Sequence, residues 1–423
     1  MKIKDIKAIE VLDSRGNPTV RTFITLEDGS IHSSSVPSGA STGSHEAVEL
    51  RDNDKNRYMG KGVLKAIENV NTIIKTEIVG MEADPNTIDE TLLKLDGTPN
   101  KANLGANAIL SVSMAVCRGA AHTENKPLWK YLNEYFFKET KTAFPRLMVN
   151  IINGGAHANW NFDIQEFMIV PNSKTPTEAV RIASEIFHSL GKILKEKNLS
   201  TLLGDEGGYS PKLDSNEEVL ETIVKAASDA GYENVKDYRI SLDVASTEFF
   251  KDGKYEIKKT GKLLTSEELT KYYQEIGQKY FILSFEDAFA EDDWKAHINF
   301  ADMAEKFKFI TIGDDLFVTN PERIQKGIEE KAANAVLIKV NQIGTIKETV
   351  EAIKMTHKAG LPRLASGKAG WKTAISHRSG ETEDSFIADL AYACASEFIK
   401  TGSMSRSERL AKYNRLLEIE QGM

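Results

Sequence analysis

The chain has 423 residues, of which 41% are hydrophobic, and its formal net charge at pH 7 is −8. It is longer than one ordinary domain, and its negative charge argues against nonspecific binding to nucleic acid or to an anionic membrane surface. Cys117 and Cys394 are the only cysteines, which excludes a disulfide framework and a cysteine zinc site. No segment has the apolar core of a signal peptide or the length of a membrane span, so we expect a cytoplasmic protein.

The first third of the chain predicts a small α+β domain. Residues 1–35 contain alternating apolar runs separated by turn residues, a pattern typical of an antiparallel meander. Residues 36–52 are rich in glycine and hydroxyl groups and are expected to form a loop, in which Ser44 could begin a helix. Apolar residues then recur at helical spacing, most clearly over residues 62–79, 86–95 and 105–125. A meander followed by helices predicts an α+β domain, which we place at residues 1–135.

The remaining residues, 136–423, predict an α/β barrel. Residues 146–155 and 165–171 are expected to be paired strands around a loop. Beyond them, short β-branched apolar runs alternate with stretches of helical spacing, which predicts βα units and a parallel sheet. One of these helices, at 265–280, begins with a capping-box pattern. Barrels of this kind keep their chemistry at the carboxyl ends of the strands.

Three acids come directly after or at the end of such runs: Asp243, Glu286 and Asp314. They are separated by 43 and 28 residues, whereas one βα unit takes about 30, so we expect them to lie on neighbouring strands. Buried carboxylates are costly unless they are paired or hold a metal, and a set of oxygen ligands suits Mg²⁺. Any one of them could instead be a solvated loop acid or a helix cap. This alternative is weaker for three acids that occupy equivalent positions at successive strand ends.

Two lysines, Lys339 and Lys400, end later strand-like runs and are expected to face the same end of the barrel. A lysine beside a divalent metal and another cation has its protonated form disfavoured, so it can act as a base near neutral pH. The alternative is that each lysine extends from the barrel rim into solvent along its apolar stem.

Ten segments, in order along nearly the whole chain, resemble the enolase family of glycolytic phosphopyruvate hydratases. They read DSRGNPTV, VPSGASTGSHEAVELRD, QEFMIVP, GDEGGYSP, SLDVASTEF, FEDAFAEDDW, GDDLFVTN, LIKVNQIGT, SHRSGETED and IKTGSMSRSERLAKYN. The resemblance implies an α+β capping domain followed by an eight-stranded, TIM-like barrel. It also implies a lyase that interconverts 2-phosphoglycerate and phosphoenolpyruvate, with two Mg²⁺ in each active site when substrate is bound.

The same resemblance implies a role for each site residue. The first Mg²⁺ is held by Asp243, Glu286 and Asp314, and the second by Ser41. Lys339 is the base for the C2 proton, and Glu206, with Glu166 beside it, is the acid that helps the C3 hydroxide leave. The residues that bind substrate are His157, Gln165, Lys339, His377, Arg378, Ser379 and Lys400. Among these, Arg378 and Ser379 contact the phosphate, and Lys400 contacts the carboxylate.

Two other interpretations stay open at this point. One is a non-enzymatic relative on the same fold, which the loss of a site residue would indicate, although every expected residue is present. The other is a related enzyme that acts on a non-phosphorylated acid, against which Arg378 and Ser379 argue. The expected partner is a small molecule rather than nucleic acid. The family forms homodimers and octamers, and the sequence does not decide between them.

One segment, residues 361–370, departs from the resemblance, because the family passes directly from helix to strand at this point. It lies between a predicted helix at 345–359 and a predicted strand at 371–376. Such connections lie on the N-terminal face of a barrel, opposite the active site. We therefore expect a surface loop that is remote from the chemistry.

Overall fold

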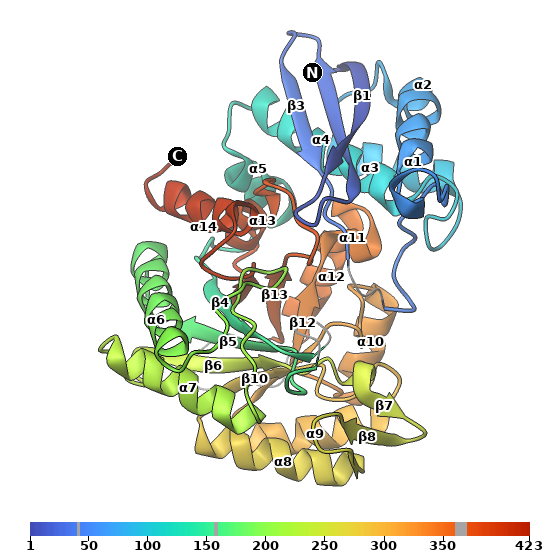
Figure 1. Ribbon diagram of the computed structural model, residues 1–423. Coiled ribbons are helices and arrows are strands. Elements are labelled where there is room, and N and C mark those ends of the chain that lie inside the picture. The colour runs from blue at the N-terminus through green and yellow to red at the C-terminus, as the bar shows by residue number, and fades with distance from the viewer. Residues whose placement is uncertain (40–42, 156–159, 360–369) are drawn as a thin grey trace.

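The structure, a computed structural model, describes residues 1–39, 43–155, 160–359 and 370–423. A small α+β unit lies above a barrel in Figure 1. The sheet of the upper unit is antiparallel and consists of β1 (Ile3–Leu12), β2 (Pro18–Leu26) and β3 (Ile31–Ser35). Buried and partly exposed residues alternate along β2, as they do in a strand with one face on a core. The predicted meander is confirmed.

The helices of the upper unit are α1 (Leu64–Asn69), a π-helical turn (Val70–Ile74), α2 (Lys75–Ile78), α3 (Pro85–Asp96), α4 (Ala106–Thr123) and α5 (Leu128–Phe136). Some of them pack directly on the antiparallel sheet, whereas α3 and α5 pack on α4. The long helix α4 is rich in small residues, which let it lie close against β2 and β3. The predicted domain boundary at residue 135 falls in the last turn of α5.

Residues 43–57 form no helix, so the expectation that Ser44 could begin one is wrong. An N-cap hydroxyl accepts a hydrogen bond from the first turn of its helix. The hydroxyl of Ser44 instead donates to Oε1 of Glu291 at 2.9 Å, and the chain runs on as a loop between the upper unit and the barrel.

Eight strands of the described chain close into a barrel, in the order β10–β11–β12–β13–β14–β4–β5–β6. Their bounds are β4 (Arg146–Asn153), β5 (Glu166–Pro171), β6 (Tyr238–Asp243), β10 (Ile282–Glu286), β11 (Ile310–Gly313), β12 (Ala335–Ile338), β13 (Lys372–Ser376) and β14 (Phe398–Lys400). The expected pairing of the strands at 146–155 and 165–171 is confirmed, and β5 runs antiparallel to both β4 and β6. The described part of the β4–β5 connection contains no crossover helix, so the chain reverses direction.

Helices cover the outside of the barrel. They are α6 (Pro176–Glu196), α7 (Asn216–Asp229), α8 (Ser266–Lys279), α9 (Trp294–Phe307), α10 (Pro321–Glu330), α11 (Val340–Ile343), α12 (Ile346–Lys358), α13 (Phe386–Ala393) and α14 (Ser407–Glu420). The capping box predicted at the start of α8 is confirmed, since Thr265 and Glu268 bond reciprocally at 2.9 and 3.2 Å. A short sheet of β7 (Phe250–Lys251), β8 (Lys254–Ile257) and β9 (Lys262–Leu264) lies beside α8 and α9.

Apolar side chains fill the interior of the barrel, among them Met148, Met168 and Phe398. A second, larger core lies between the strands and the surrounding helices. The interior is therefore a packed core rather than a pore, and polar groups gather above it at one end. Because β5 is antiparallel, its first residue, Glu166, lies at the same end as the last residues of the parallel strands.

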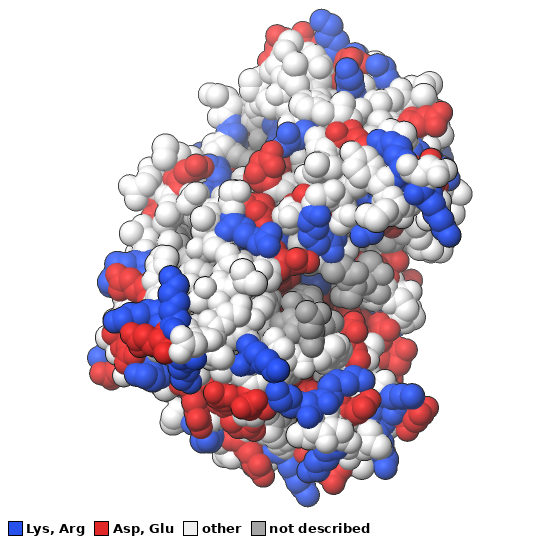
Figure 2. Space-filling view, viewed as in Figure 1, with Lys and Arg blue, Asp and Glu red and all other residues white. Residues whose placement is uncertain are grey.

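None of the described helices is long and apolar enough to cross a membrane. Figure 2 shows that Lys and Arg are interspersed with Asp and Glu over the visible face.

Candidate active site

Four buried acids lie side by side at the end of the barrel that faces the upper unit. Glu166 is the register partner of Asp243 across β5 and β6, and Asp243 is the partner of Glu286 across β6 and β10. Asp314 follows β11, the next strand after β10 in the barrel. The expectation that Asp243, Glu286 and Asp314 lie on neighbouring strands is thus confirmed.

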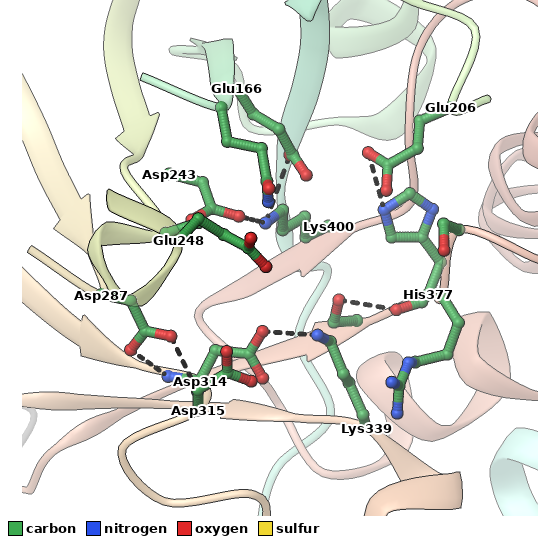
Figure 3. Close-up of a pocket in the computed structure, with 15 residues that line it drawn as sticks. Glu166, Glu206, Asp243, Glu248, Asp287, Asp314, Asp315, Lys339, His377 and Lys400 are labelled. Atoms are coloured by element: carbon green, nitrogen blue, oxygen red, sulfur yellow. Dashed lines mark hydrogen bonds and ion pairs between the residues drawn. The ribbon is translucent and has the colours of Figure 1, made fainter. Parts of the chain in front are cut away.

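Lys400, on β14, joins three of these acids. Its Nζ lies 2.7 Å from Asp243 Oδ2, 2.8 Å from Glu286 Oε1 and 3.2 Å from Glu166 Oε2. Burial by itself lowers the pKa of Lys400, but the charges of Asp243, Glu166 and Glu286 outweigh it and hold this pKa well above its ordinary value. The ammonium group thus neutralises part of the acidic cluster (Figure 3).

Lys339, which follows β12, is paired with Asp314. Its Nζ donates to Asp314 Oδ2, while Gln342 donates to Asp314 Oδ1 at 2.9 Å. Burial lowers the pKa of Lys339, but the charge of Asp314 more than compensates, and the net direction is upward. This differs from the direction expected from the sequence, because a carboxylate rather than a cation is the charge nearest to the amine.

Two further acids, Asp287 and Asp315, lie beside Asp314, and ligand atoms of all three lie within 4.8 Å of one another. The carboxylate of Asp287 accepts the backbone N–H groups of Asp314 at 2.9 Å and of Asp315 at 2.8 Å. It therefore fixes the backbone that presents Asp314. Burial, followed by the charge of Asp314, raises the pKa of Asp315 to about 7. Both are visible in the sequence as the second of two adjacent acids at a strand end, although neither was assigned a specific role in the site.

Glu166 and Glu206 form the opposite wall of the pocket. Burial, together with the charge of Glu206, raises the pKa of Glu166 well above its ordinary value. Asn150 donates to Glu206 Oε2 at 3.1 Å, and Nε2 of His377 lies 3.6 Å from the same oxygen.

Arg378 lies in the segment after β13 and is bound by a residue of the upper unit. Its Nη1 donates to Glu46 Oε2 at 2.8 Å and to Asn341 Oδ1 at 3.0 Å. Burial lowers the pKa of Arg378, but the charge of Glu46 reverses this and raises it. Glu46 lies in one of the segments that resemble the enolase family, but no other feature of the sequence indicates that it pairs with Arg378. Ser379, the next residue, faces the same pocket.

The donor set suits a hard cation. Asp243, Glu286 and Asp314 offer only oxygen, and Oε2 of Glu286 is buried without a hydrogen-bond partner among the described residues. An orphaned buried carboxylate oxygen is costly unless a ligand or ion reaches it. These residues therefore fit Mg²⁺, and none of them is a soft ligand.

Most of the predicted site residues meet in one pocket. Those that line it are Gln165, Glu166, Glu206, Asp243, Asp314, Lys339, His377, Arg378, Ser379 and Lys400. Glu286 does not line the pocket and is bonded to Lys400. Ser41 and His157 lie outside the described residues. Glu248 also lines the pocket and was not predicted.

Acids, lysines and an arginine that converge at the carboxyl ends of barrel strands define a barrel enzyme. Residues 141–423 match the family described as "Enolase, C-terminal TIM barrel domain", and residues 3–132 match "Enolase, N-terminal domain". The protein named Enolase from Elusimicrobium minutum (strain Pei191) is 53% identical over 423 residues, which cover 99% of this chain and 96% of that protein. The chain belongs to the enolase family and is an enzyme of the lyase class.

Proposed function

We propose that the chain catalyses the Mg²⁺-dependent, reversible dehydration of 2-phosphoglycerate to phosphoenolpyruvate in glycolysis and gluconeogenesis. The observation that carries this proposal is the arrangement of amine and acids across one pocket. Lys339 lies on one wall, and Glu166 and Glu206 lie on the other (Figure 3). A dehydration needs a base at the carbon that loses its proton and an acid at the departing hydroxyl group, and the two must not neutralise each other.

Lys339 is the proposed base. As a neutral amine it takes the C2 proton of the substrate, which is adjacent to a carboxylate. Its hydrogen bond to Asp314 favours the protonated form, whereas the positive charges of Arg378 and Lys400 oppose it. A cation bound by Asp314 would compete for this carboxylate and so release the amine for proton transfer.

Glu206 is the proposed acid, with Glu166 as its partner. Burial and the negative charge of Glu206 raise the pKa of Glu166 well above its ordinary value, which favours a proton on this pair of acids. The acid can therefore give its proton to the C3 hydroxyl group as that group leaves, and the reverse reaction returns the proton.

The remaining residues hold the substrate. In this proposal Lys400 contacts its carboxylate, and Arg378 with Ser379 contacts its phosphate, which is supported by the ability of a guanidinium to make paired contacts to phosphate oxygens. Gln165, His377 and His157 complete the proposed substrate-binding set.

The proposed metal ligands are Asp243, Glu286 and Asp314 for a first Mg²⁺ and Ser41 for a second. Bound Mg²⁺ would supply positive charge that stabilises the negative charge developing on the substrate carboxylate as the C2 proton is removed. We further propose a cytoplasmic location and a homodimer or octamer as the assembly.

An assay of the purified protein tests the proposal. Conversion of 2-phosphoglycerate should produce the ultraviolet absorbance of an enol phosphate, and excess chelator should abolish it. A folded protein that gives no product in the presence of Mg²⁺ would contradict the proposed reaction. Product formation that persists in excess chelator would contradict the proposed cofactor alone.

A further inference from the structure

Arg409, on helix α14, reaches two segments of the proposed active site although it does not line the pocket. The side chain is fully buried. Nη1 donates at 2.6 Å both to Nδ1 of His377 and to the carbonyl of Arg378. Nη2 donates to the carbonyls of Ser379 at 2.6 Å and Asp205 at 3.1 Å. One guanidinium thus ties residues 377–379 to the loop that carries Glu206.

The contact with His377 determines which ring nitrogen carries the proton. A guanidinium only donates hydrogen bonds and stays charged in proteins. Nδ1 must therefore be the acceptor, and a neutral imidazole with an acceptor at Nδ1 is protonated at Nε2. Burial lowers the pKa of His377 well below its ordinary value, so the ring is neutral near pH 7.

The tautomer matters because Nε2 faces the proposed acid (Figure 3). Its N–H is directed at Glu206 Oε2, 3.6 Å away, a separation that can shorten when a substrate is bound. Asn150 donates to the same oxygen at 3.1 Å. With two donors at Oε2, a proton on Glu206 is carried by Oε1. The opposite tautomer would present a lone pair to Glu206, and the acid would then donate its proton to the ring instead of to a substrate.

We propose that Arg409 is a positioning residue that fixes His377 in the Nε2–H form, so that Glu206 keeps its proton for the substrate. The proposal rests on the role assigned to Glu206 above and adds a group on the outer helix layer to the acid–base machinery. Arg409 touches no reacting atom and acts only through His377 and the loop of Glu206.

Nitrogen NMR of protein labelled with ¹⁵N-histidine tests the tautomer without any catalysis. The ring signals of His377 are identified as those lost in His377→Gln. In the unsubstituted protein near neutral pH, Nε2 should be protonated and Nδ1 unprotonated. A protonated Nδ1 would overturn the proposal, whatever the variants do. In Arg409→Met, the second tautomer should appear. A folded Arg409→Met with an unchanged His377 spectrum would also overturn it.

A double-mutant cycle tests whether Arg409 acts through the histidine. Arg409→Lys keeps the charge but cannot reach four acceptors, and it should lower kcat by about 10- to 100-fold with little change in KM, as for a lost outer partner of a site residue. In the His377→Gln background, the same substitution should have little further effect. Two effects that simply multiply would show a general structural role and would contradict the proposal.

Arg415 offers a matched control on the same helix, where its guanidinium is bound to Asp389 by two hydrogen bonds of 2.9 Å. Arg415→Lys should leave both kcat and the His377 spectrum unchanged. A protein that shows the expected tautomer but no turnover of 2-phosphoglycerate would contradict the proposed function and leave the role of Arg409 in setting the tautomer supported.

Discussion

The carboxylate of Glu46 and the guanidinium of Arg378 form a buried ion pair between the upper unit and the barrel, with Oε2 2.8 Å from Nη1 and Oε1 3.2 Å from Nη2. Gln342 lies between this pair and Asp314, 3.5 Å from Glu46 Oε1 and 2.9 Å from Asp314 Oδ1. The residue proposed to contact the substrate phosphate is therefore already bound to an internal anion, and that anion is linked to a proposed metal ligand.

The first prediction concerns this pair. Glu46→Gln removes a negative charge beside the guanidinium and keeps a hydrogen-bond acceptor, so inorganic phosphate should bind several-fold more tightly, because like-charge repulsion is relieved. Calorimetric titration with phosphate measures the change. Glu348→Gln, which alters another carboxylate paired between the two units, with Lys101 at 2.6 Å, is the control and should bind phosphate as the unsubstituted protein does. Weaker phosphate binding in Glu46→Gln would mean that Glu46 supports Arg378 rather than competing for it.

The second prediction concerns the metal. Asp314→Asn and Glu286→Gln keep side-chain volume but remove ligand charge, and each should abolish turnover and the stabilisation against heat that Mg²⁺ confers on the unsubstituted protein. Thermal unfolding with and without Mg²⁺ gives a readout independent of activity. Asp302→Asn, which changes an exposed acid on α9, should retain both properties. Equal Mg²⁺ stabilisation of all three variants would place the cation elsewhere.

The third prediction separates the base from the acid. Lys339→Met should abolish exchange of the substrate C2 proton with deuterated water. Glu206→Gln should retain this exchange while dehydration falls by about 10²-fold or more, the range for a lost general acid. Proton NMR follows the exchange, and absorbance follows the dehydration. The opposite pattern would reverse the two assignments.

The fourth prediction concerns Asp89, a buried acid of α3 whose Oδ2 accepts from Ser113 Oγ and from the backbone N–H of Lys347, both at 2.9 Å. Burial raises the pKa of Asp89 from 3.8 to about 7 in the folded protein. The folded state therefore holds the proton between about pH 4 and 7 while the unfolded state releases it, and the free energy of unfolding falls as the pH rises through this window.

Asp89→Asn should remove this pH dependence, since an amide does not titrate. At pH 8 the variant should be more stable than the unsubstituted protein, by up to roughly 4 kcal/mol for a shift of this size. Denaturant unfolding at pH 5 and pH 8 measures the difference. A variant that is less stable at pH 8 would show that the charged carboxylate is well solvated by its donors.

The fifth prediction concerns residues 361–370, of which only Gly370 lies within the described part of the chain. The flanking residues meet, because the N–H of Trp371 donates to the carbonyl of Ala359 at 2.6 Å. β13 begins next to this contact, and Ser376, at the opposite end of the strand, lines the pocket. Deletion of 361–370 should leave turnover and KM nearly normal. A well-folded deletion variant more than about tenfold slower, which is about 1.4 kcal/mol in the barrier, would contradict the expected remoteness.

Much of the fold and part of the site could be predicted from local sequence. A short apolar run that ends in a charged residue predicts both a strand and the position of its carboxyl end. This is why Asp243, Glu286 and Lys400 were expected at one end of the barrel. The direction of β5 could not be predicted in this way, since an apolar run looks the same in parallel and antiparallel strands. It depends on the length and path of the preceding connection.

The contacts that organise the site could not be predicted, because they join distant segments without any periodic pattern. Glu46 and Arg378 are 332 residues apart, and their pairing depends on how the upper unit sits on the barrel. Asp287 is visible as an acid at a strand end. Its backbone has a left-handed conformation, with φ of 40°, and its carboxylate accepts from the backbone of Asp314 and Asp315. Nothing in the residue types at this position predicts that conformation.

The helix that carries Arg409 comes after every barrel strand in the chain, so a ribosome makes it after the strands that bear the acids and lysines. The four hydrogen bonds that hold His377, the two residues after it and the loop of Glu206 therefore all depend on the last helix of the chain. A chain that ends before α14 should therefore lack the fixed histidine, so an ordered proton donor at this site requires the whole length of the chain.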